Sequence, residues 1–255
     1  MKKQDIKQVN VPIASLRREP NNDSELETQC LFGEEVRIFS QKNNWFLCKT
    51  ESDYYEGWIK KKYLSDINPK SHKIINLITH IYKEPCVKSK VVKKLYFSSK
   101  ILIKRFNSHW SVIFFDNNEF YVFNKHVTPI NNINKKWIET SYNFLGAPYL
   151  WGGKTFSGID CSGLVQLALS DAGIFLPRNS SNQLLYDHPK IKNVSMIEEN
   201  CLIFWGGHVA IAIKKNKILH SNAYHMCVKT EPLDTALKRI NKKYGEIIKV
   251  KKILL

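Results

Sequence analysis

Apolar and polar residues follow a short-strand pattern through the first half of the chain. The segments VRIF and ILIK alternate between apolar and polar positions, whereas WFLCK and WSVIFF are runs of aromatic and branched side chains. The loops between such segments carry Asn, Asp, Ser and Pro. This pattern predicts short β-strands joined by polar turns.

The strand pattern occurs twice. A constant shift of 65 positions places Trp45 on Trp110. Units of about 60 residues with five or six short strands are typical of small closed barrels. We therefore predict a duplicated all-β domain, with one barrel over residues 1–68 and a second over 69–130. Further like residues align under the same shift, namely Glu19 with Glu84, Phe32 with Phe97, Ile38 with Ile103 and Tyr55 with Phe120.

The composition changes after the polar segment TPINNINKK, which we interpret as a linker. Apolar residues at Trp137, Ile138 and Leu145 predict a short helix that ends at Gly146. A glycine-rich loop, YLWGGKTFSGI, then leads into DCSGLVQLALSDAG. We predict a third domain over residues 131–255.

The segment from Cys161 to Asp171 predicts a buried helix. It contains no proline and is apolar over most of its surface. Asp160 is suited to cap the N-terminus of this helix, and Gly173 is suited to end it. Cys161 then lies in the first helical turn.

A cysteine in a first helical turn has a chemical use beyond packing. The free N–H groups there, with an adjacent imidazolium, can lower the pKa of a thiol. The same N–H groups can stabilise the oxyanion that forms when the thiolate attacks a carbonyl. We therefore interpret Cys161 as a nucleophile with a lowered pKa. A buried structural cysteine, capped by coincidence, is the alternative for this motif alone.

The base should be one of the eight histidines. His208 opens the apolar segment HVAIAI, and His220 ends KILH after the polar turn KKNK, so the two segments predict a β-hairpin. His225 lies a few residues further on. The remaining histidines fall in the predicted barrels or in a polar loop: His72, His80, His109, His126 and His188.

The register of this hairpin decides whether the two imidazoles can interact. A loop with an odd number of residues places His220 opposite Ala210, so that His208 and His220 share one face as diagonal neighbours, roughly 7–8 Å apart. A regular two-residue turn without a bulge places them on opposite faces. We predict the odd register, in which His220 orients His208 within a Cys–His–His triad.

We expect neither a metal nor a cofactor. His225 and Cys227 are two positions apart, which would put them on one face of a strand, but such spacing is common in any strand. A zinc site built from His220, His225 and Cys227 lacks a recognised ligand spacing and a fourth ligand.

The composition narrows the range of partners. The 255 residues carry a formal net charge of +16, but the lysines are scattered between apolar positions, so nucleic acid is not an expected partner. No stretch approaches the roughly 20 apolar residues that cross a bilayer, and no membrane partner is expected. The six cysteines contain no CxxC pair, which favours reduced thiols. We expect a cytoplasmic monomer without a signal peptide.

Two parts of the chain resemble known families. The stretch IETSYNFLGAPYLWGGKTFSGIDCSGLVQLALSDAG, followed later by GGHVAIAI and ILHSNAY, resembles the NlpC-type cell-wall cysteine peptidases. The segments LRREP, GEEVRIF, NNWFLCK and YEGWIKKKYL resemble a bacterial SH3-like domain that accompanies such enzymes. The resemblance implies a multidomain protein with two N-terminal all-β SH3-like barrels and a papain-like α+β cysteine peptidase domain.

The resemblance also implies individual roles. Three residues match the catalytic triad, and six match positions that bind the substrate. In the family pattern Pro-Gly-Asp-Leu stands where this chain has Glu-Asn-Cys-Leu, a departure that affects a turn but not the triad. The implied catalytic residues are Cys161, His208 and His220, and the implied substrate-binding residues are Tyr149, Asp160, Ser162, Ser180, Glu25 and Tyr55.

The implied reaction is hydrolysis of the γ-D-Glu–diaminopimelate (or Lys) amide in murein peptides with a free N-terminal L-Ala. Asp160 and a barrel carboxylate, Glu25 or the nearby Glu27, would pair with the free ammonium group. The implied biological role is recycling of cell-wall peptides. Two alternatives remain, namely a catalytically inactive module that binds cell-wall peptides and an amidase that acts on another wall amide.

Overall fold

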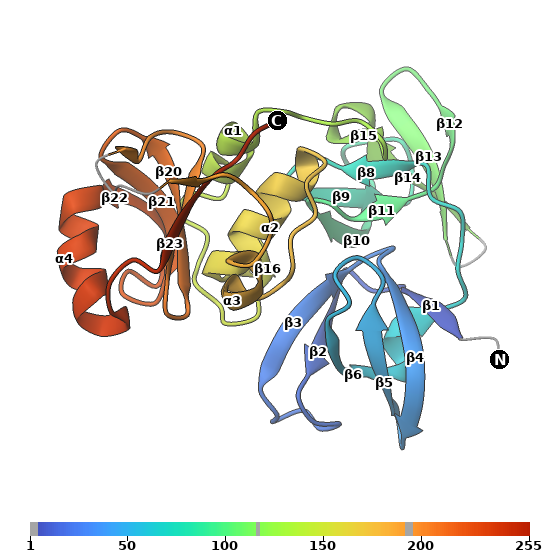
Figure 1. Cartoon of the computed structure of the whole chain (residues 1–255). Helices are drawn as coiled ribbons and strands as arrows, with labels where there is room; N and C mark the ends of the chain where they lie inside the picture. Colours follow the sequence, from blue (N-terminus) through green and yellow to red (C-terminus); the bar gives the residue numbers. More distant parts are fainter. Residues whose placement is uncertain (1–4, 116–117, 192–195) are drawn as a thin grey trace. The chain divides into compact units, whose positions relative to one another are not determined.

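The computed structural model describes residues 5–115, 118–191 and 196–255. The chain divides into two compact units, Met1–Asn132 and Ile133–Leu255 (Figure 1). Within the described ranges no helix is long and apolar enough to span a membrane.

The first part of the N-terminal unit is an antiparallel sheet in the strand order β3-β2-β6-β5-β4-β1-β7. Its core contains the fully buried Leu16, Val36, Cys48 and Ile59. Alternating burial along the strands places these residues on the inner face. The elements are β1 Ile6–Val9, β2 Ile13–Arg17, β3 Leu26–Leu31, β4 Glu35–Lys42, β5 Trp45–Thr50, β6 Glu56–Lys60, the 3₁₀ turn Lys61–Tyr63 and β7 Leu64–Ser65.

The second part of this unit forms two small antiparallel sheets, in the orders β10-β9-β14-β13-β12 and β11-β8-β15. Ile74, Ile81, Leu95 and Ile113 are among its core residues. The elements are β8 His72–Ile74, β9 Ile78–Tyr82, β10 Val91–Tyr96, β11 Lys100–Ile101, β12 Ile103–Phe106, β13 Trp110–Phe115, β14 Asn118–Phe123, the 3₁₀ turn Asn124–His126 and β15 Val127–Pro129.

The internal repeat is confirmed at the level of secondary structure. Strands β2 and β9, β3 and β10, and β5 and β13 begin at positions that are 65 residues apart. Each copy also closes with a three-residue 3₁₀ turn followed by a short strand. Both parts of the unit therefore repeat one succession of elements, except that two strands, β11 and β12, stand in the second copy where the first has β4.

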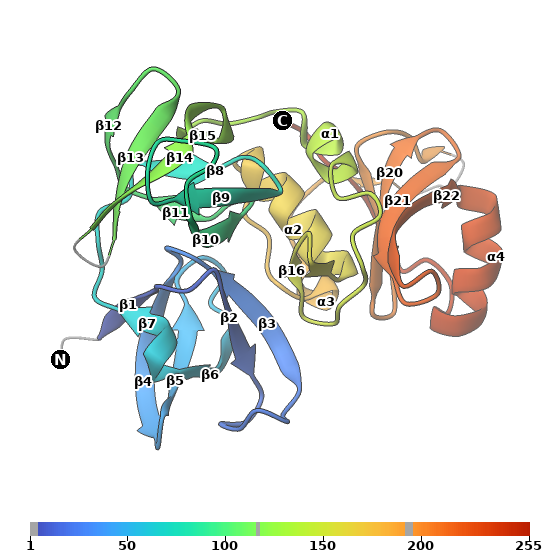
Figure 2. The same cartoon turned by 180° about the vertical axis from the view of Figure 1, so that it is seen from behind.

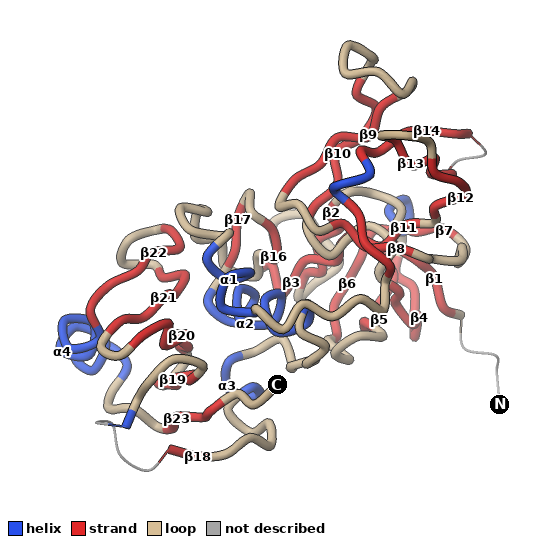
Figure 3. The backbone as a smooth tube through the Cα atoms, turned by 90° about the horizontal axis from the view of Figure 1, so that it is seen from above, coloured by secondary structure: helices blue, strands red, loops and turns tan. Residues whose placement is uncertain are grey.

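The C-terminal unit is built on a six-stranded antiparallel sheet in the order β18-β23-β19-β20-β21-β22. Helices α1 and α2 lie on one side of this sheet and α4 on the other (Figures 2 and 3). The elements are α1 Trp137–Tyr142, β16 Lys154–Thr155, β17 Gly158–Ile159, α2 Cys161–Asp171, α3 Ser180–Gln183, β18 Lys190–Ile191, β19 Cys201–Trp205, β20 His208–Lys214, β21 Lys217–Asn222, β22 Cys227–Pro232, α4 Leu233–Tyr244 and β23 Lys249–Lys252.

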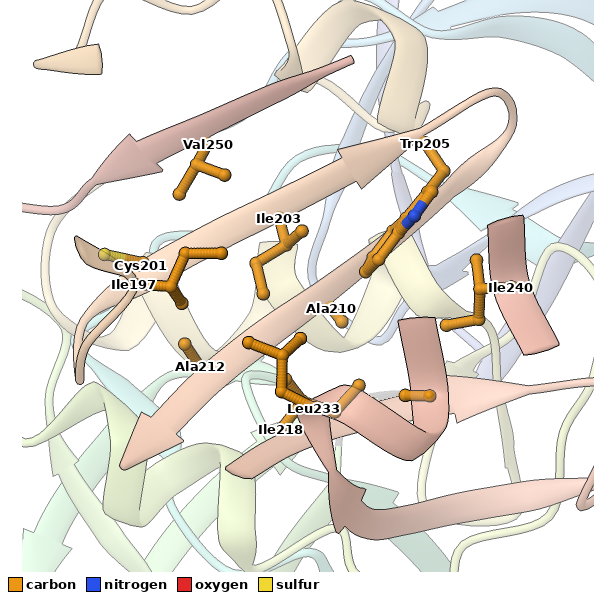
Figure 4. Packing of buried hydrophobic residues seen from close by; sticks show 11 residues of the cluster. Ile197, Cys201, Ile203, Trp205, Ala210, Ala212, Ile218, Leu233, Ile240 and Val250 are labelled. Atoms are coloured by element: carbon orange, nitrogen blue, oxygen red, sulfur yellow. The ribbon is translucent and has the colours of Figure 1, made fainter. Parts of the chain in front are cut away.

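Helix α4 packs its apolar face on the sheet. Leu233, Ala236 and Ile240 recur at helical spacing and are buried against Trp205 and Ala210 (Figure 4). Burial of a side chain such as Leu233 or Ile240 contributes about 1.5–3 kcal/mol to folding. This packing fixes α4 over the sheet and thereby positions its polar residues.

Helix α2 begins and ends as predicted. Asp160 is the N-cap, and its side chain accepts a hydrogen bond from the Gly163 N–H at 2.7 Å. Gly173 adopts φ +80°, which suits a glycine beyond a helix C-terminus. Helix α1 is shorter than predicted, because it ends at Tyr142 and the chain reaches Gly146 through tight i+3 turns.

At residues 199–202, where the sequence departs from the family pattern, the turn before β19 contains a non-glycine residue in a left-handed conformation. Asn200 adopts φ +68° immediately before β19. Glycine reaches this left-handed region most easily, but asparagine is among the side chains that tolerate it. The turn that precedes β19 therefore keeps a left-handed residue without a glycine.

Gly163 generates a testable prediction, because α2 lies against the backbone of the glycine-rich loop. A Cβ atom at position 163 would lie 2.5 Å from the Gly153 carbonyl oxygen. In an open helix Gly→Ala stabilises by about 0.5–1 kcal/mol, but here we expect Gly163→Ala to destabilise by about 1–3 kcal/mol. Urea denaturation measures this difference.

The control is Ser170→Ala on the same helix, which should change the free energy of unfolding by no more than about 0.5 kcal/mol. A Gly163→Ala protein as stable as the wild type would contradict the close approach.

Candidate active site

Cys161 lies at the first position of α2 and is buried. Its side chain lines a cavity of about 470 Å³ together with Tyr149 and His208. All of these residues belong to the C-terminal unit. The remaining lining residues are Trp151, Gly207, Asn222, Ala223, Tyr224, Arg239, Ile240, Lys243 and Tyr244.

The predicted hairpin register is confirmed. Strands β20 and β21 pair Ile211 with Leu219 and Ala212 with Ile218. In this register His208 and His220 lie on the same face, since side chains alternate along each strand. The register shifts between Ala212 and Lys214, which identifies a bulge next to the turn. Without this bulge, His220 would face the other side of the sheet.

The register brings the two imidazoles into direct contact. His208 Nε2 and His220 Nδ1 are 2.8 Å apart, and both side chains are buried. The ring of Tyr244 stacks on His208 with centroids 5.9 Å apart and an interplanar angle of 20°. These contacts hold the His208 ring in one orientation beside the cavity.

The hydrogen-bond chain extends one residue beyond the predicted triad. The other ring nitrogen of His220, Nε2, lies 2.7 Å from Glu231 Oε1. Glu231 also forms an ion pair with Arg239 of α4. Sequence reasoning missed Glu231. The signal that could have found it is its strand register: β21 and β22 pair His220 with Lys229, so Glu231 is a diagonal neighbour of His220 on the same face.

The electrostatics of the free site differ from the sequence-based expectation. Burial raises the pKa of the Cys161 thiol to about 12, and the charge of Asp160 adds to this rise. Burial is the main cause that lowers the pKa of His208 to about 3, and the charges of His220 and Arg239 contribute to the same shift. The expected lowering of the thiol pKa is therefore wrong, because desolvation outweighs the backbone N–H groups at the helix N-terminus.

The carboxylate of Asp160 is held by hydrogen bonds from residues of the C-terminal unit. Arg178, a fully buried side chain, holds the carboxylate with Nη1–Oδ1 at 2.9 Å and Nη2–Oδ2 at 2.6 Å. The Gly152 N–H donates to the same carboxylate at 2.8 Å. Ser162 Oγ accepts a hydrogen bond from Arg178 at 2.8 Å. Asp160 and Ser162 thus fix the start of α2 in the folded protein, and their contact with substrate stays a prediction.

The remaining predicted substrate residues lie in different places. Tyr149 is in the cavity, and burial raises the pKa of its phenol, which therefore stays protonated. Ser180 begins α3 and is half-buried outside the residues that line the cavity. Glu25 and Tyr55 belong to the N-terminal unit, where Tyr55 donates a hydrogen bond to Glu27 at 2.7 Å and Arg18 pairs with both carboxylates.

His225 and Cys227 do not share a strand. His225 lies in the turn before β22, which begins at Cys227. The His225 ring approaches Glu231 instead, with Nε2 3.7 Å from Oε1. Among the described residues, no group of three or more His, Cys, Asp or Glu side chains is arranged to hold a metal ion.

A thiol at a helix N-terminus, an imidazole in the same cavity and a second imidazole behind it are the parts of a cysteine-type hydrolase. Comparisons with known proteins agree. Residues 146–244 match the NlpC/P60 family, and residues 16–64 match the bacterial dipeptidyl-peptidase SH3 domain. The chain is a cysteine-type peptidase with an NlpC/P60 domain behind an N-terminal SH3 domain.

Similar proteins cover most of the chain. The γ-D-glutamyl-L-lysine dipeptidyl-peptidase of Bacillus cereus is 26% identical over 84% of this chain and 72% of its own length. Dipeptidyl-peptidase 6 of Lysinibacillus sphaericus is 25% identical over 82% of this chain and 85% of its own length. The crystal structure of an NlpC/P60 family protein from Bacillus cereus has the same fold, with a TM-score of 0.83 and 20% identity over 98% of this chain and 100% of the other.

The raised thiol pKa predicts how Cys161 reacts in the free enzyme. Its rate of alkylation by iodoacetamide should still rise with pH above about 8.5, where an ordinary thiol is half ionised. Peptide mapping by mass spectrometry separates Cys161 from the exposed Cys86, which serves as an internal reference. A plateau in the Cys161 rate that is already reached below about pH 7 would instead reveal a thiolate–imidazolium pair.

Proposed function

We propose that this protein hydrolyses the amide between γ-D-Glu and the third residue of murein peptides that carry a free N-terminal L-Ala. The observation that supports this proposal best is the shared cavity of Cys161, Tyr149 and His208. The printed activities of the relatives, γ-D-glutamyl-L-lysine dipeptidyl-peptidases from two Bacillus species, support the substrate class.

The proposed reaction starts from a neutral thiol and a neutral imidazole. His208 takes the proton of Cys161 as the sulfur attacks the amide carbon, since the raised thiol pKa and lowered imidazole pKa disfavour a resting ion pair. The C–N bond then breaks as His208 protonates the leaving amine, and a thioester remains. Water deprotonated by His208 attacks the thioester, and the released thiolate recovers the proton.

The oxyanion of each tetrahedral intermediate needs hydrogen-bond donors. The first backbone N–H groups of α2 supply donors at the position of Cys161. Tyr149 keeps its hydroxyl proton because its pKa is raised, so this phenol is a further donor within the cavity. We assign Tyr149 to the oxyanion in this scheme.

Recognition of the free amine is assigned to carboxylates. In the SH3 domain Glu25 and Glu27 are held by Arg18, and Tyr55 donates to Glu27. We propose that this carboxylate pair contributes to amine recognition, with Asp160 as a second candidate and Ser162 and Ser180 along the bound peptide. A requirement for a free amine would restrict the enzyme to peptides already released from the glycan, which suits a role in recycling and a cytoplasmic location.

Two further proposals concern the fold of residues 69–130 and of the C-terminal unit. We propose that residues 69–130 are a second SH3-like domain, because they repeat the element order of the first copy. We also propose that the C-terminal unit is papain-like, because a helix that carries the cysteine at its N-terminus packs beside an antiparallel sheet that carries the histidine. The second copy lacks a counterpart of Gly57-Trp58.

Two cationic side chains in the cavity wall are relevant to which third substrate residue is preferred. Arg239 and Lys243 of α4 both line the cavity, but Arg239 is paired with Glu231. Lys243 lies beside the Tyr244 ring, with Nζ 5.1 Å from its centroid. A lysine ammonium attracts a carboxylate and repels a second ammonium, so we propose a preference for diaminopimelate over lysine.

The substrate assignment is tested with synthetic L-Ala-γ-D-Glu-diaminopimelate and its N-acetylated form, with products followed by mass spectrometry. Wild type should release L-Ala-D-Glu from the free peptide, whereas Cys161→Ala should release none. Equal cleavage of the N-acetylated peptide would refute the free-amine requirement. Binding without cleavage by the wild type would favour the inactive binding module, and cleavage of a different wall amide would favour the amidase alternative.

The preference for diaminopimelate gives a separate prediction. Lys243→Gln should lower the ratio of kcat/KM for the diaminopimelate peptide over the lysine peptide by roughly fivefold, the effect of about 1 kcal/mol for one solvated charge pair. The matched control is Lys238→Gln on the exposed side of α4, which should leave the ratio unchanged. An unchanged ratio in Lys243→Gln would remove Lys243 from substrate selection.

A further inference from the structure

Three neighbouring strands supply one continuous hydrogen-bond chain. His208 comes from β20, His220 from β21 and Glu231 from β22. The two links measure 2.8 Å and 2.7 Å between heavy atoms. Because each residue is a diagonal neighbour of the next, the antiparallel register places the three side chains on one face within reach of one another.

The carboxylate of Glu231, at the end of this hydrogen-bond chain, determines where the protons on the two imidazoles lie. An ionised carboxylate only accepts hydrogen bonds, so His220 Nε2 must donate to Glu231. Burial lowers the pKa of His220, so its ring is neutral at neutral pH. Its Nδ1 then offers a lone pair, and His208 Nε2 must donate to it. This leaves His208 Nδ1 without a proton and available as the base.

Glu231 is built to stay ionised. Burial tends to raise its pKa, but the hydrogen bond from His220 and the charge of Arg239 outweigh burial, and the pKa is lowered overall. Arg239 is itself held in place, with its guanidinium 4.3 Å from the centroid of the Tyr224 ring. His225 is the other titratable group close to Glu231, and its ring nitrogen lies 3.7 Å away.

We propose that Glu231 is a positioning residue of the active site, which acts through His220 to fix the tautomer and orientation of His208. The inference rests on the proposed peptidase function. In each half-reaction the proton moves between His208 Nδ1 and either Cys161, the leaving amine or water. The protons on His208 Nε2 and His220 Nε2 stay where they are, and Glu231 is never protonated.

Two substitutions test this role. Glu231→Leu removes the acceptor, whereas Glu231→Gln keeps an amide oxygen that can accept the hydrogen bond from His220 but carries no negative charge. We expect kcat on the tripeptide to fall by about 10- to 100-fold in Glu231→Gln and by about 10²- to 10⁴-fold in Glu231→Leu. KM should change by less than about threefold, since Glu231 does not touch the substrate.

The control variants are Glu139→Gln and Glu139→Leu, which remove an exposed carboxylate of α1 that pairs with Lys136. Both should retain wild-type kcat. If Glu231→Leu fails to fold, the Gln variant alone decides: an unchanged kcat, or a rise in KM without a fall in kcat, would overturn the role.

A double-mutant cycle separates positioning from a purely structural contribution. If Glu231 acts through His220, Glu231→Gln should lower kcat by less than about twofold in a His220→Gln background. Additive losses would overturn the coupling.

The rate of Cys161 alkylation at neutral pH gives a readout that needs no peptide. The rate should fall in the Glu231 variants and not in the Glu139 variants. If the rate falls in the Glu231 variants while the wild type cleaves no murein peptide, the proposed substrate is refuted and the positioning role of Glu231 is supported. An unchanged rate would overturn the positioning role.

Discussion

The arrangement of the active site depends on the hydrogen bond between His208 and His220, and that bond depends on one bulge. The pairing of β20 with β21 shifts register between Ala212 and Lys214, next to the turn. Side chains alternate between the faces of a strand, so a shift of one residue moves a whole strand's side chains to the opposite face. The bulge therefore places both imidazoles on the face that also carries Glu231.

A second constraint fixes the nucleophile. Asp160 caps α2 and is locked in turn by Arg178, a buried cation with two bonds to the carboxylate. Removal of one partner of such a buried pair typically costs about 3–5 kcal/mol, because the other charge is left uncompensated. The same burial raises the thiol pKa, so the site keeps Cys161 protonated and relies on an oriented base to activate it.

Local features of the sequence predicted a large part of this architecture. The bounds of α2 and its cap at Asp160 follow from spacing and capping rules, which act over a few residues. For the histidine hairpin, turn rules reduced the choice to two registers, and the predicted one is reached through the bulge next to the turn. The repeat likewise predicted where the strands of the second copy begin. These are properties that neighbouring residues decide.

The features that the sequence did not predict depend on burial and on contacts between distant segments. The thiol pKa was misjudged because desolvation depends on the whole surrounding fold. Glu231 and Arg178 were missed because a carboxylate in VKTEP or an arginine in LPRNS looks like an ordinary surface charge until its partner is known. Helix α1 ends early, and beyond its end the Gly146 N–H donates to the carbonyl of Val228, which is distant in the sequence.

The most direct test of the central claim is nitrogen NMR of histidine-labelled protein, with Cys161→Ala used to prevent turnover and thiol chemistry. The ring nitrogens of His208 report its tautomer. We expect a neutral ring at neutral pH, with the proton on Nε2 and an unprotonated Nδ1. A proton on Nδ1, or a doubly protonated His208, would contradict it.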